Sequence, residues 1–403
     1  MVKKCIMRGV VGKDLNEKEI KQFAKKVVNY IYENNYKKSI IVAKDNRVTG
    51  DYILNLLCGV LLSKGIEVNV VGVATTPELA WLTKRFKFDL GIMITASHNP
   101  SEYNGFKCFN SLGAMIELDD CKLKNFRRVE YAKEIDFSKF KELYLRDLKN
   151  QLNTSKIKCV FDCANGAGVD VVRKVFGKSK IIGADTSGKY VNKDCGSEHL
   201  DNIKAVCKRN KKIGFAFDGD ADRVVAIDEF GNVVDGDKIL YILATQLLGF
   251  GDKIVGTIVS SLGLEISLRR LGVTLVRERV GANYVNNRRV KENSMLAGEG
   301  CGHIFLNSNI SDGVRVAIEL INILNRTGLS FNQLLSGYKN TYKLTKDIDL
   351  SKVDEIAESE QVCKTMRVIV RKGETEPKLR IYIEGIDKVL VENKFEQLLQ
   401  QFN

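Results

Sequence analysis

Residues 90–100 read LGIMITASHNP, an apolar run that ends in a polar loop. The run predicts a buried β-strand, because strands covered on both faces have few polar positions. The loop holds one of the three histidines and one of the three prolines of the 403-residue chain, beside Ser97. Adjacent side chains of extended backbone point to opposite sides, so His98 is badly placed to take a proton from Ser97. If Ser97 takes part in chemistry, a group from elsewhere must activate it.

Short apolar runs alternate with amphipathic stretches along three similar units of the chain. Strands are predicted in the first unit at 39–44, 67–72 and 90–95, in the second at 158–163, 180–184 and 213–217, and in the third at 253–259, 273–278 and 294–298. Helical stretches such as 51–65 and 264–272 lie between them. Each unit therefore has a βαβαβ pattern, which is typical of a mainly parallel sheet covered by helices.

The last part of the chain has a different pattern. Two strands are predicted around 365–370 and 379–385, followed by a terminal helix over 388–401. We therefore predict an α/β protein with three similar mixed α/β domains of the βαβαβ type and a smaller C-terminal α+β domain. A helix over 137–152 is expected to connect the first two units. The predicted domains are 1–145, 146–247, 248–338 and 339–403.

A polar loop follows the last predicted strand of each of the three units. The loops are TASHNP at 95–100, DGDADR at 218–223 and GEGCGH at 298–303. Ligand sites of open α/β sheets form outside the carboxyl ends of the strands. The three loops are therefore expected to face one cleft.

The second loop places three carboxylates at alternate positions, Asp218, Asp220 and Asp222. They would repel one another at one spot unless a hard cation lay among them, and magnesium prefers such oxygen ligands. A solvated acidic turn is the alternative. The similar stretch VDGDKI at 234–239 is expected to be only a turn and a cap for the helical run that follows.

Two further loops have residues suited to a sugar phosphate. Glycines around Glu299, Cys301 and His303 permit close approach of a ligand, and a carboxylate accepts hydrogen bonds from sugar hydroxyls. RKGETEPK at 371–378 offers a guanidinium and backbone donors to a phosphate. An ordinary tight turn and a solvated hairpin tip are the alternatives.

Composition limits the class of protein and its partners. The net charge is +13, but the lysines are dispersed among acidic residues, so we expect attraction of anionic phosphate substrates and no nucleic-acid partner. No apolar run approaches the roughly 20 residues that span a bilayer, and no signal peptide is recognised. The ten cysteines form no CxxC pair. We expect a cytoplasmic protein with reduced thiols and no membrane partner.

In this order the motifs resemble those of the α-D-phosphohexomutase family. TASHNP with the following NGFK resembles its phosphoserine loop, DGDADR its magnesium loop, GEGCGH its sugar-binding loop and RKGETEP its phosphate-binding loop. The stretches IMRGVVG at 6–12 and GVATTPELAWLTK at 72–84 also resemble family segments. The resemblance implies four domains around a central cleft and a phosphoryl transfer on a hexose phosphate.

The resemblance also implies roles for single residues. Ser97, carried as phosphoserine, would give its phosphoryl group to the hexose phosphate and take the other one back from a sugar bisphosphate, which is both intermediate and activator. One Mg²⁺ per chain would be held by Ser97, Asp218, Asp220 and Asp222. Proton transfer and charge balance would fall to Lys107, Arg8 and His98. The remaining candidates would bind the substrate: Arg223, Arg279, Glu299, Cys301, His303, Arg371, Gly373 and Thr375.

Within the family, NKDCGSEH at 192–199 and GHIFLNSNISDG at 302–313 resemble the branch that acts on glucosamine phosphates. Mannose or glucose phosphates are the alternative substrates. A non-catalytic sugar-phosphate-binding protein and a phosphatase with an aspartate nucleophile are the alternative functions. A monomer or a homodimer is expected. The chain departs from the family pattern at four positions: Cys301 in place of serine, Gly373 and Glu374 in the phosphate loop, and Arg279 in place of lysine.

Overall fold

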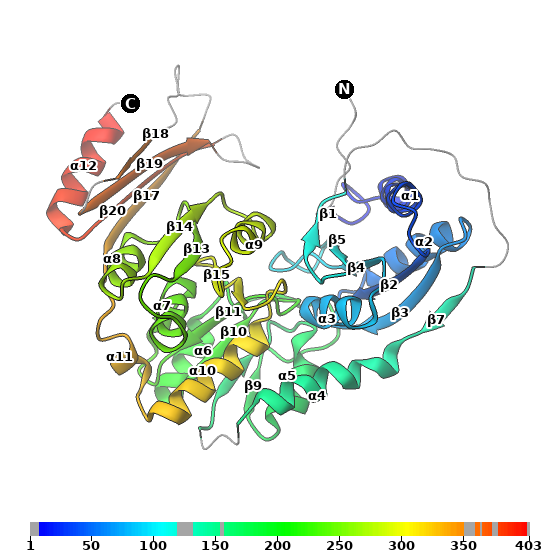
Figure 1. Cartoon of the computed structure of the whole chain (residues 1–403), viewed down its shortest axis with the longest axis horizontal. Helices are drawn as coiled ribbons and strands as arrows, with labels where there is room; N and C mark the ends of the chain where they lie inside the picture. Colours follow the sequence, from blue (N-terminus) through cyan, green and yellow to red (C-terminus); the bar gives the residue numbers. More distant parts are fainter. Residues whose placement is uncertain are drawn as a thin grey trace.

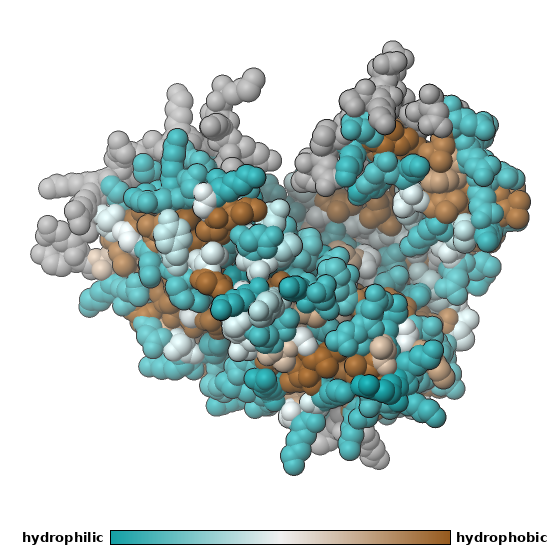
Figure 2. All heavy atoms as spheres, turned by 180° about the vertical axis from the view of Figure 1, so that it is seen from behind, coloured by the Kyte–Doolittle hydropathy of each residue, from teal (hydrophilic) through white to brown (hydrophobic). Residues whose placement is uncertain are grey.

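The computed structural model describes residues 8–118, 132–153, 157–349, 359–362, 365–372 and 378–400. Four sheets follow one another around an arc, and the N-terminal and C-terminal units lie at its two ends (Figure 1). Figure 2 shows a notch between these ends. The predicted class, three similar mixed α/β units and a smaller sheet-containing C-terminal domain, is confirmed, whereas the exact domain boundaries stay a prediction. None of the helices in the described ranges could cross a membrane.

The first sheet has the strand order β1-β5-β4-β2-β3-β7, with β6 paired to β5. Its strands are β1 (Arg8–Val10), β2 (Ser39–Lys44), β3 (Glu67–Val73), β4 (Leu90–Ile94), β5 (Tyr103–Asn110), β6 (Met115–Ile116) and β7 (Glu134–Asp136). Its helices are α1 (Glu17–Glu33), α2 (Gly50–Leu62) and α3 (Thr76–Phe86). Alternate residues of β2 face opposite sides, since Ile40 and Val42 pack with α1 and α2 while Ile41 packs with α3.

The second and third sheets have the orders β12-β11-β10-β8-β9 and β14-β13-β15-β16. The second unit contains β8 (Val160–Asp162), β9 (Lys180–Ile182), β10 (Gly214–Phe217), β11 (Val224–Ile227) and β12 (Val233–Val234), with η1 (Ser138–Phe140), α4 (Lys141–Gln151), α5 (Gly168–Phe176) and α6 (Asp201–Asn210). The third contains β13 (Lys253–Thr257), β14 (Thr274–Glu278), β15 (Leu296–Gly298) and β16 (Ile304–Leu306), with α7 (Gly236–Leu247), α8 (Leu262–Arg270), α9 (Ala282–Lys291), α10 (Gly313–Thr327) and α11 (Phe331–Leu334). One hydrophobic core runs through both units.

The fourth sheet is antiparallel throughout, with the order β17-β20-β19-β18. It consists of β17 (Tyr342–Asp349), β18 (Ser359–Val362), β19 (Met366–Lys372) and β20 (Lys378–Gly385), and α12 (Lys388–Gln400) covers one face. Hydrogen bonds near the start of α8 join it to the third unit. Arg367 donates to the carbonyl of Ser260 over 3.1 Å, and the N–H of Leu262 donates to Glu384 over 2.8 Å.

The three loops predicted to share a cleft occupy equivalent positions in their sheets. Each follows a parallel strand (β4, β10 or β15) and leads into an antiparallel neighbour (β5, β11 or β16). The sequence did not reveal these antiparallel strands, and several predicted strands are one to three residues shorter than expected. One of them, β9, ends at Ile182 because the next residue, Gly183, has a left-handed φ of 55°.

A buried arginine holds the TASHNP loop in place. Arg47 lies between β2 and α2, donates to the carbonyls of Ser97 and Asn99 over 2.9 and 2.8 Å, and pairs with Asp45 over 2.9 Å. Asp45 also accepts from Thr95 at the start of the loop over 2.7 Å. Both charges are withdrawn from water, so each depends on the other for compensation.

Removal of this arginine tests how much the loop depends on it. Arg47→Met leaves the Asp45 carboxylate buried without its cation, and we expect the free energy of unfolding to fall by about 3–5 kcal/mol. The matched control is Arg269→Met, which breaks a pair to Glu265 whose arginine is 62% exposed; it should cost no more than about 1 kcal/mol. Urea denaturation followed by circular dichroism measures both. Equal losses in the two variants would contradict the proposed dependence.

Candidate active site

Ser97 contacts the acidic loop of the second unit directly. Its Oγ donates to Asp218 over 2.7 Å, and its backbone N–H donates to Thr95 over 2.9 Å. The residue is buried and has a φ of 52°, a left-handed conformation that is rare for a residue with a side chain. This conformation, held by the contacts of the loop backbone, turns the hydroxyl toward Asp218.

His98, the neighbour of Ser97 in the loop, is partly buried. In the described part of the chain its Nδ1 has no hydrogen-bond partner. Burial, helped by the charges of Arg223, Arg8 and Lys107, lowers the pKa of His98 to about 3. The imidazole is therefore neutral in this arrangement, and the charge-balancing role of His98 stays a prediction.

The three aspartates of the acidic loop converge as the sequence predicted. Oxygens of Asp218, Asp220 and Asp222 all lie within 4.8 Å of one another, and the three residues are buried in the turn from β10 to β11. Lys107, on β5 of the first unit, donates to Asp220 over 2.6 Å and to Asp222 over 2.5 Å. Thr76 at the start of α3 donates to Asp220 as well, over 2.5 Å. Residues of the first unit thus complete the charge environment of the second.

The three carboxyl groups differ in their protonation. Burial and the neighbouring carboxylates raise the pKa of Asp218 to about 7. Burial also opposes ionisation of Asp220 and Asp222. Lys107 together with Thr76 at Asp220, and Lys107 together with His303 and Arg223 at Asp222, outweigh it and lower the pKa of both. One ammonium is therefore not enough to hold all three groups ionised.

This donor set fits a hard divalent cation. The Oδ1 atom of Asp220 is buried and has no hydrogen-bond partner among the described residues. The atoms that could bind a metal ion here are carboxylate oxygens and the hydroxyl oxygen of Ser97. Magnesium prefers such oxygen ligands. The similar stretch VDGDKI at 234–239 caps a helix, as predicted: Asp235 accepts a hydrogen bond from the N–H of Lys238 over 3.0 Å at the start of α7.

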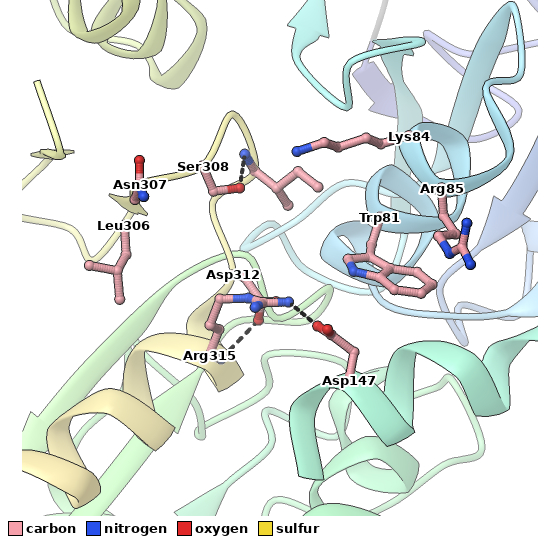
Figure 3. Close-up of a pocket in the computed structure, with 10 residues that line it drawn as sticks. Trp81, Lys84, Arg85, Asp147, Leu306, Asn307, Ser308, Asp312 and Arg315 are labelled. Carbon is pink, nitrogen blue, oxygen red and sulfur yellow. Dashed lines mark hydrogen bonds and ion pairs between the residues drawn. The ribbon is translucent and has the colours of Figure 1, made fainter. Parts of the chain in front are cut away.

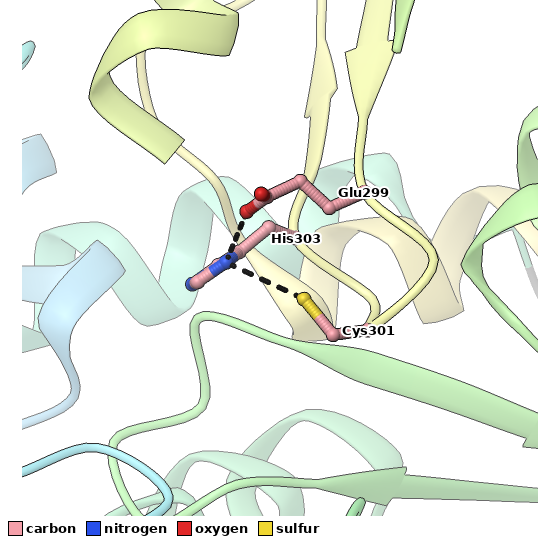
Figure 4. A group of neighbouring side chains, drawn as sticks. All are labelled: Glu299, Cys301 and His303. Carbon is pink, nitrogen blue, oxygen red and sulfur yellow. Dashed lines mark hydrogen bonds and ion pairs between the residues drawn. The ribbon is translucent and has the colours of Figure 1, made fainter. Parts of the chain in front are cut away.

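The GEGCGH loop is joined to the acidic loop through His303. The Nε2 of His303 lies 3.0 Å from Asp222, and its Nδ1 lies 3.0 Å from Glu299. Burial opposes protonation of this imidazole, but Asp222 outweighs burial and raises the pKa of His303 well above its usual value. Glu299 also accepts from the N–H of Gly281 over 3.0 Å. Figure 4 shows Glu299 and the exposed Cys301 directed at the same imidazole, with the sulfur 3.9 Å from Nδ1.

The predicted arginines Arg8, Arg223 and Arg279 lie at different distances from the three aspartates. The backbone N–H of Arg223 donates to Asp218 over 3.2 Å, and its guanidinium donates to Glu198 over 3.0 Å. Arg8 reaches the TASHNP loop by donating to Asn99 over 3.0 Å. Arg279 stacks on the ring of Tyr284 at 3.3 Å and lines a separate pocket of about 250 Å³. The structure does not bring it into contact with the three aspartates.

The phosphate-loop candidates are only partly described. The backbone of Arg371 lies at the end of β19, paired with Arg380 of β20. Gly373, Glu374 and Thr375 lie outside the described residues. Their roles therefore stay predictions.

Sequence reasoning missed the residues that hold the loops together. The stretch NKDCGSEH at 192–199, singled out above only for its resemblance to one branch of the family, also contacts the serine loop. The amide of Asn192 donates to the carbonyls of Ser97 and Asn99 over 2.7 and 2.9 Å. Gly219 permits this packing, because a Cβ there would lie 2.9 Å from the carbonyl oxygen of Ser97. Nothing in the local pattern could reveal a contact between such distant segments.

A cavity of about 450 Å³ lies among α3, α4 and α10 (Figure 3). Arg315 lies in its wall between Asp147 and Asp312, at 2.7 and 3.4 Å. Lys84 points across the cavity toward the segment that contains Ser308. None of the predicted site residues lines it.

Comparisons with known proteins agree with this arrangement. Residues 4–124, 142–231 and 235–342 match the alpha/beta/alpha domains I, II and III of phosphoglucomutase/phosphomannomutase. A phosphoglucosamine mutase of Clostridium botulinum is 34% identical over 96% of this chain and 95% of its own length. One of Acetivibrio thermocellus is 32% identical over 91% and 90%.

The fold is likewise shared with a solved structure. A phosphoglucomutase/phosphomannomutase family protein of Burkholderia thailandensis superposes with a TM-score of 0.81, with 21% identity over 98% of this chain and 94% of that chain. Three matched domains in order, and relatives at about a third identity along nearly the whole length, decide the assignment. The chain belongs to the α-D-phosphohexomutase family.

Proposed function

We propose that this protein interconverts glucosamine 6-phosphate and glucosamine 1-phosphate through a phosphoserine at Ser97. The observation that carries the proposal is the 2.7 Å contact between the Ser97 hydroxyl and Asp218, within a group of three buried carboxylates. The relatives named phosphoglucosamine mutase support the glucosamine substrate. They do not favour the mannose or glucose alternatives, nor a protein that only binds sugar phosphates. The position of Ser97 among groups suited to phosphoryl transfer also argues against a phosphatase with an aspartate nucleophile.

The reaction consists of two phosphoryl transfers that use the same serine. In the first, the bond between the phosphorus and the Ser97 oxygen breaks while the substrate hydroxyl attacks, which gives a sugar bisphosphate. In the second, the reoriented bisphosphate returns its other phosphoryl group to Ser97. The proton released by the attacking hydroxyl must be accepted, and the serine oxygen must be protected from water. The oxygen of Ser97 is protected from water, since the residue is only 1% exposed.

Magnesium is the proposed cofactor, held by Ser97, Asp218, Asp220 and Asp222, and it would offset the negative charge that the transferring phosphoryl group carries. Lys107 is the proposed proton carrier. Asp220 and Asp222 now outweigh burial and hold the pKa of Lys107 above its usual value. A cation held by the same carboxylates would weaken that stabilisation, so the ammonium of Lys107 would be a better acid and its free amine could accept a proton.

Arg8, Arg223 and Glu299 are proposed to orient the substrate. The guanidinium of Arg8 contacts the TASHNP loop, and that of Arg223 lies 3.9 Å from Asp218 in the acidic loop, so the two come from different units and suit phosphate oxygens. Glu299 stays ionised because the hydrogen bonds from His303 and Gly281 outweigh burial and lower its pKa. Its charge suits hydroxyl and ammonium groups of the sugar. Arg371, Gly373 and Thr375 remain proposed ligands of the distal phosphate.

Replacement of the serine tests the phosphoenzyme. Ser97→Ala should fold normally and lose at least about 10³-fold in turnover, because the group that carries the phosphoryl is gone. Ser101→Ala, at the residue that follows this loop, is the matched control and should keep activity within about twofold. Intact-mass analysis should find one labile phosphate on the wild type and none on Ser97→Ala. Full turnover by Ser97→Ala without added bisphosphate would rule out the phosphoserine.

Removal of metal tests the acidic loop. Chelation should abolish turnover and magnesium should restore it, and Asp220→Asn should raise the magnesium concentration needed for half activity by at least about tenfold. Asp235→Asn, at the cap of α7, should leave this concentration unchanged. The measurement is initial rate against free magnesium. Undiminished activity after exhaustive chelation would rule out the metal site.

Coupled assays on three substrates test the specificity. A glucosamine ammonium can pair with a carboxylate such as Glu299, and a charge-assisted hydrogen bond of about 1.5–3 kcal/mol corresponds to roughly 10- to 150-fold discrimination. We expect kcat/KM for glucosamine phosphate to exceed the values for glucose and mannose phosphates by at least about tenfold. Equal or faster turnover of mannose 1-phosphate would move the substrate assignment while leaving the phosphoserine mechanism intact.

A further inference from the structure

A second group of metal-ligand side chains lies next to the three aspartates and has a different chemistry. Glu299, Cys301 and His303 place a carboxylate oxygen, a thiol sulfur and an imidazole nitrogen within 4.8 Å of one another. Figure 4 shows the three side chains converging from one loop, with Glu299 and Cys301 on two sides of the His303 ring. The oxygen lies 3.0 Å and the sulfur 3.9 Å from the same atom, Nδ1.

These separations are close to those of ligands around a tetrahedral zinc ion. With zinc bonds of about 2.0–2.1 Å to nitrogen, 2.0–2.2 Å to oxygen and 2.3 Å to sulfur, neighbouring ligand atoms lie about 3.3–3.6 Å apart. The oxygen–nitrogen distance of 3.0 Å lies a few tenths of an ångström below this range, and the sulfur–nitrogen distance of 3.9 Å lies a few tenths above it. Cys301 is exposed, so its side chain has room to rotate toward the imidazole.

Two of the three proposed ligands, His303 and Glu299, are also held in orientation by hydrogen bonds to neighbouring groups. Metal-binding histidines usually donate their second ring N–H to a carboxylate, which fixes the ring and its tautomer. Here Nε2 of His303 lies 3.0 Å from Asp222, so Nδ1 is the nitrogen that faces Glu299 and Cys301. Glu299 keeps its orientation through the N–H of Gly281, which leaves its second oxygen directed at the imidazole.

The donor set selects a soft or borderline ion over magnesium. Thiolate and imidazole prefer zinc and its chemical neighbours, whereas magnesium prefers oxygen ligands alone. Cys301 stands where the family resemblance leads us to expect serine, so the thiol is what distinguishes this loop. The positive charge of Arg223 opposes a cation here, and the carboxylates of Asp222 and Glu299 offset it.

We propose that Glu299, Cys301 and His303 form a binding site for a zinc-class divalent cation, separate from the three-aspartate site, through which such an ion inhibits the enzyme. The ion enters from the solvent side, where Cys301 is exposed. On binding, the thiol of Cys301 and Nδ1 of His303 each release a proton. Three protein ligands leave the fourth position to water, which keeps the ion exchangeable. Inhibition, which rests on the proposed function, follows because Glu299 is no longer available to the sugar.

Cobalt(II) is the probe for binding, because a cobalt–thiolate bond absorbs in the near ultraviolet. The full-length protein is titrated with Co²⁺ in excess Mg²⁺, which occupies the aspartate site, and zinc is then added. We expect one equivalent of thiolate-bound cobalt that zinc displaces. Cys301→Ser should abolish the band, and Glu299→Gln should weaken cobalt binding by at least about tenfold. Cys58→Ala, which removes a buried thiol in α2, is the control and should keep the band.

The absence of a thiolate band, or a band that survives in Cys301→Ser, would overturn the site. Because binding is measured without substrate, this result does not depend on mutase activity. Inhibition is tested separately in the coupled assay. Zinc should raise the apparent KM for the sugar phosphate at saturating magnesium, and Cys301→Ser should weaken this inhibition at least about tenfold. Cobalt binding without inhibition by zinc would overturn the inhibitory role.

Discussion

The arrangement of the site depends on one lysine that pairs with two of three buried carboxylates. At an effective dielectric constant of about 20, two charges about 5 Å apart repel by roughly 3 kcal/mol, so three aspartates cannot all be ionised without compensation. Lys107 supplies one positive charge to Asp220 and Asp222, and the raised pKa of Asp218 relieves part of the remainder. Because Lys107 comes from the first sheet, the charge balance of the second unit also fixes where the first unit lies.

Much of the fold was predictable because it is encoded locally. Runs such as 39–44 and 90–95 are apolar on both faces of a strand, and β2 and β4 formed where they were predicted. The three loops were identified because glycines and carboxylates follow such strands directly. What could not be predicted is the antiparallel strand after each loop. β5 carries Asn104, Gly105 and Lys107 among its residues, a composition that conceals its strand character until it pairs with β4.

The contacts that join the site were beyond sequence reasoning for a different reason. Arg47 and Asn192 both donate to the carbonyls of Ser97 and Asn99, although one belongs to the first unit and the other to the second. Such contacts have no spacing or periodicity, since they depend on the final approach of two sheets. His303 shows the same limit. Its loop was recognised, but the pairing with Asp222 exists only after the second and third units have packed together.

The core shared by the second and third units has a consequence for synthesis of the chain. The first unit has its own core, formed by residues between Leu15 and Cys108, and can fold soon after it leaves the ribosome. Phe215 of the second sheet packs instead against Phe331 in α11, which is made much later. At ordinary translation rates of about 5–20 residues per second, the second sheet waits roughly ten seconds with part of its apolar surface uncovered. We therefore expect the nascent chain to need chaperone protection most while the third unit is being translated.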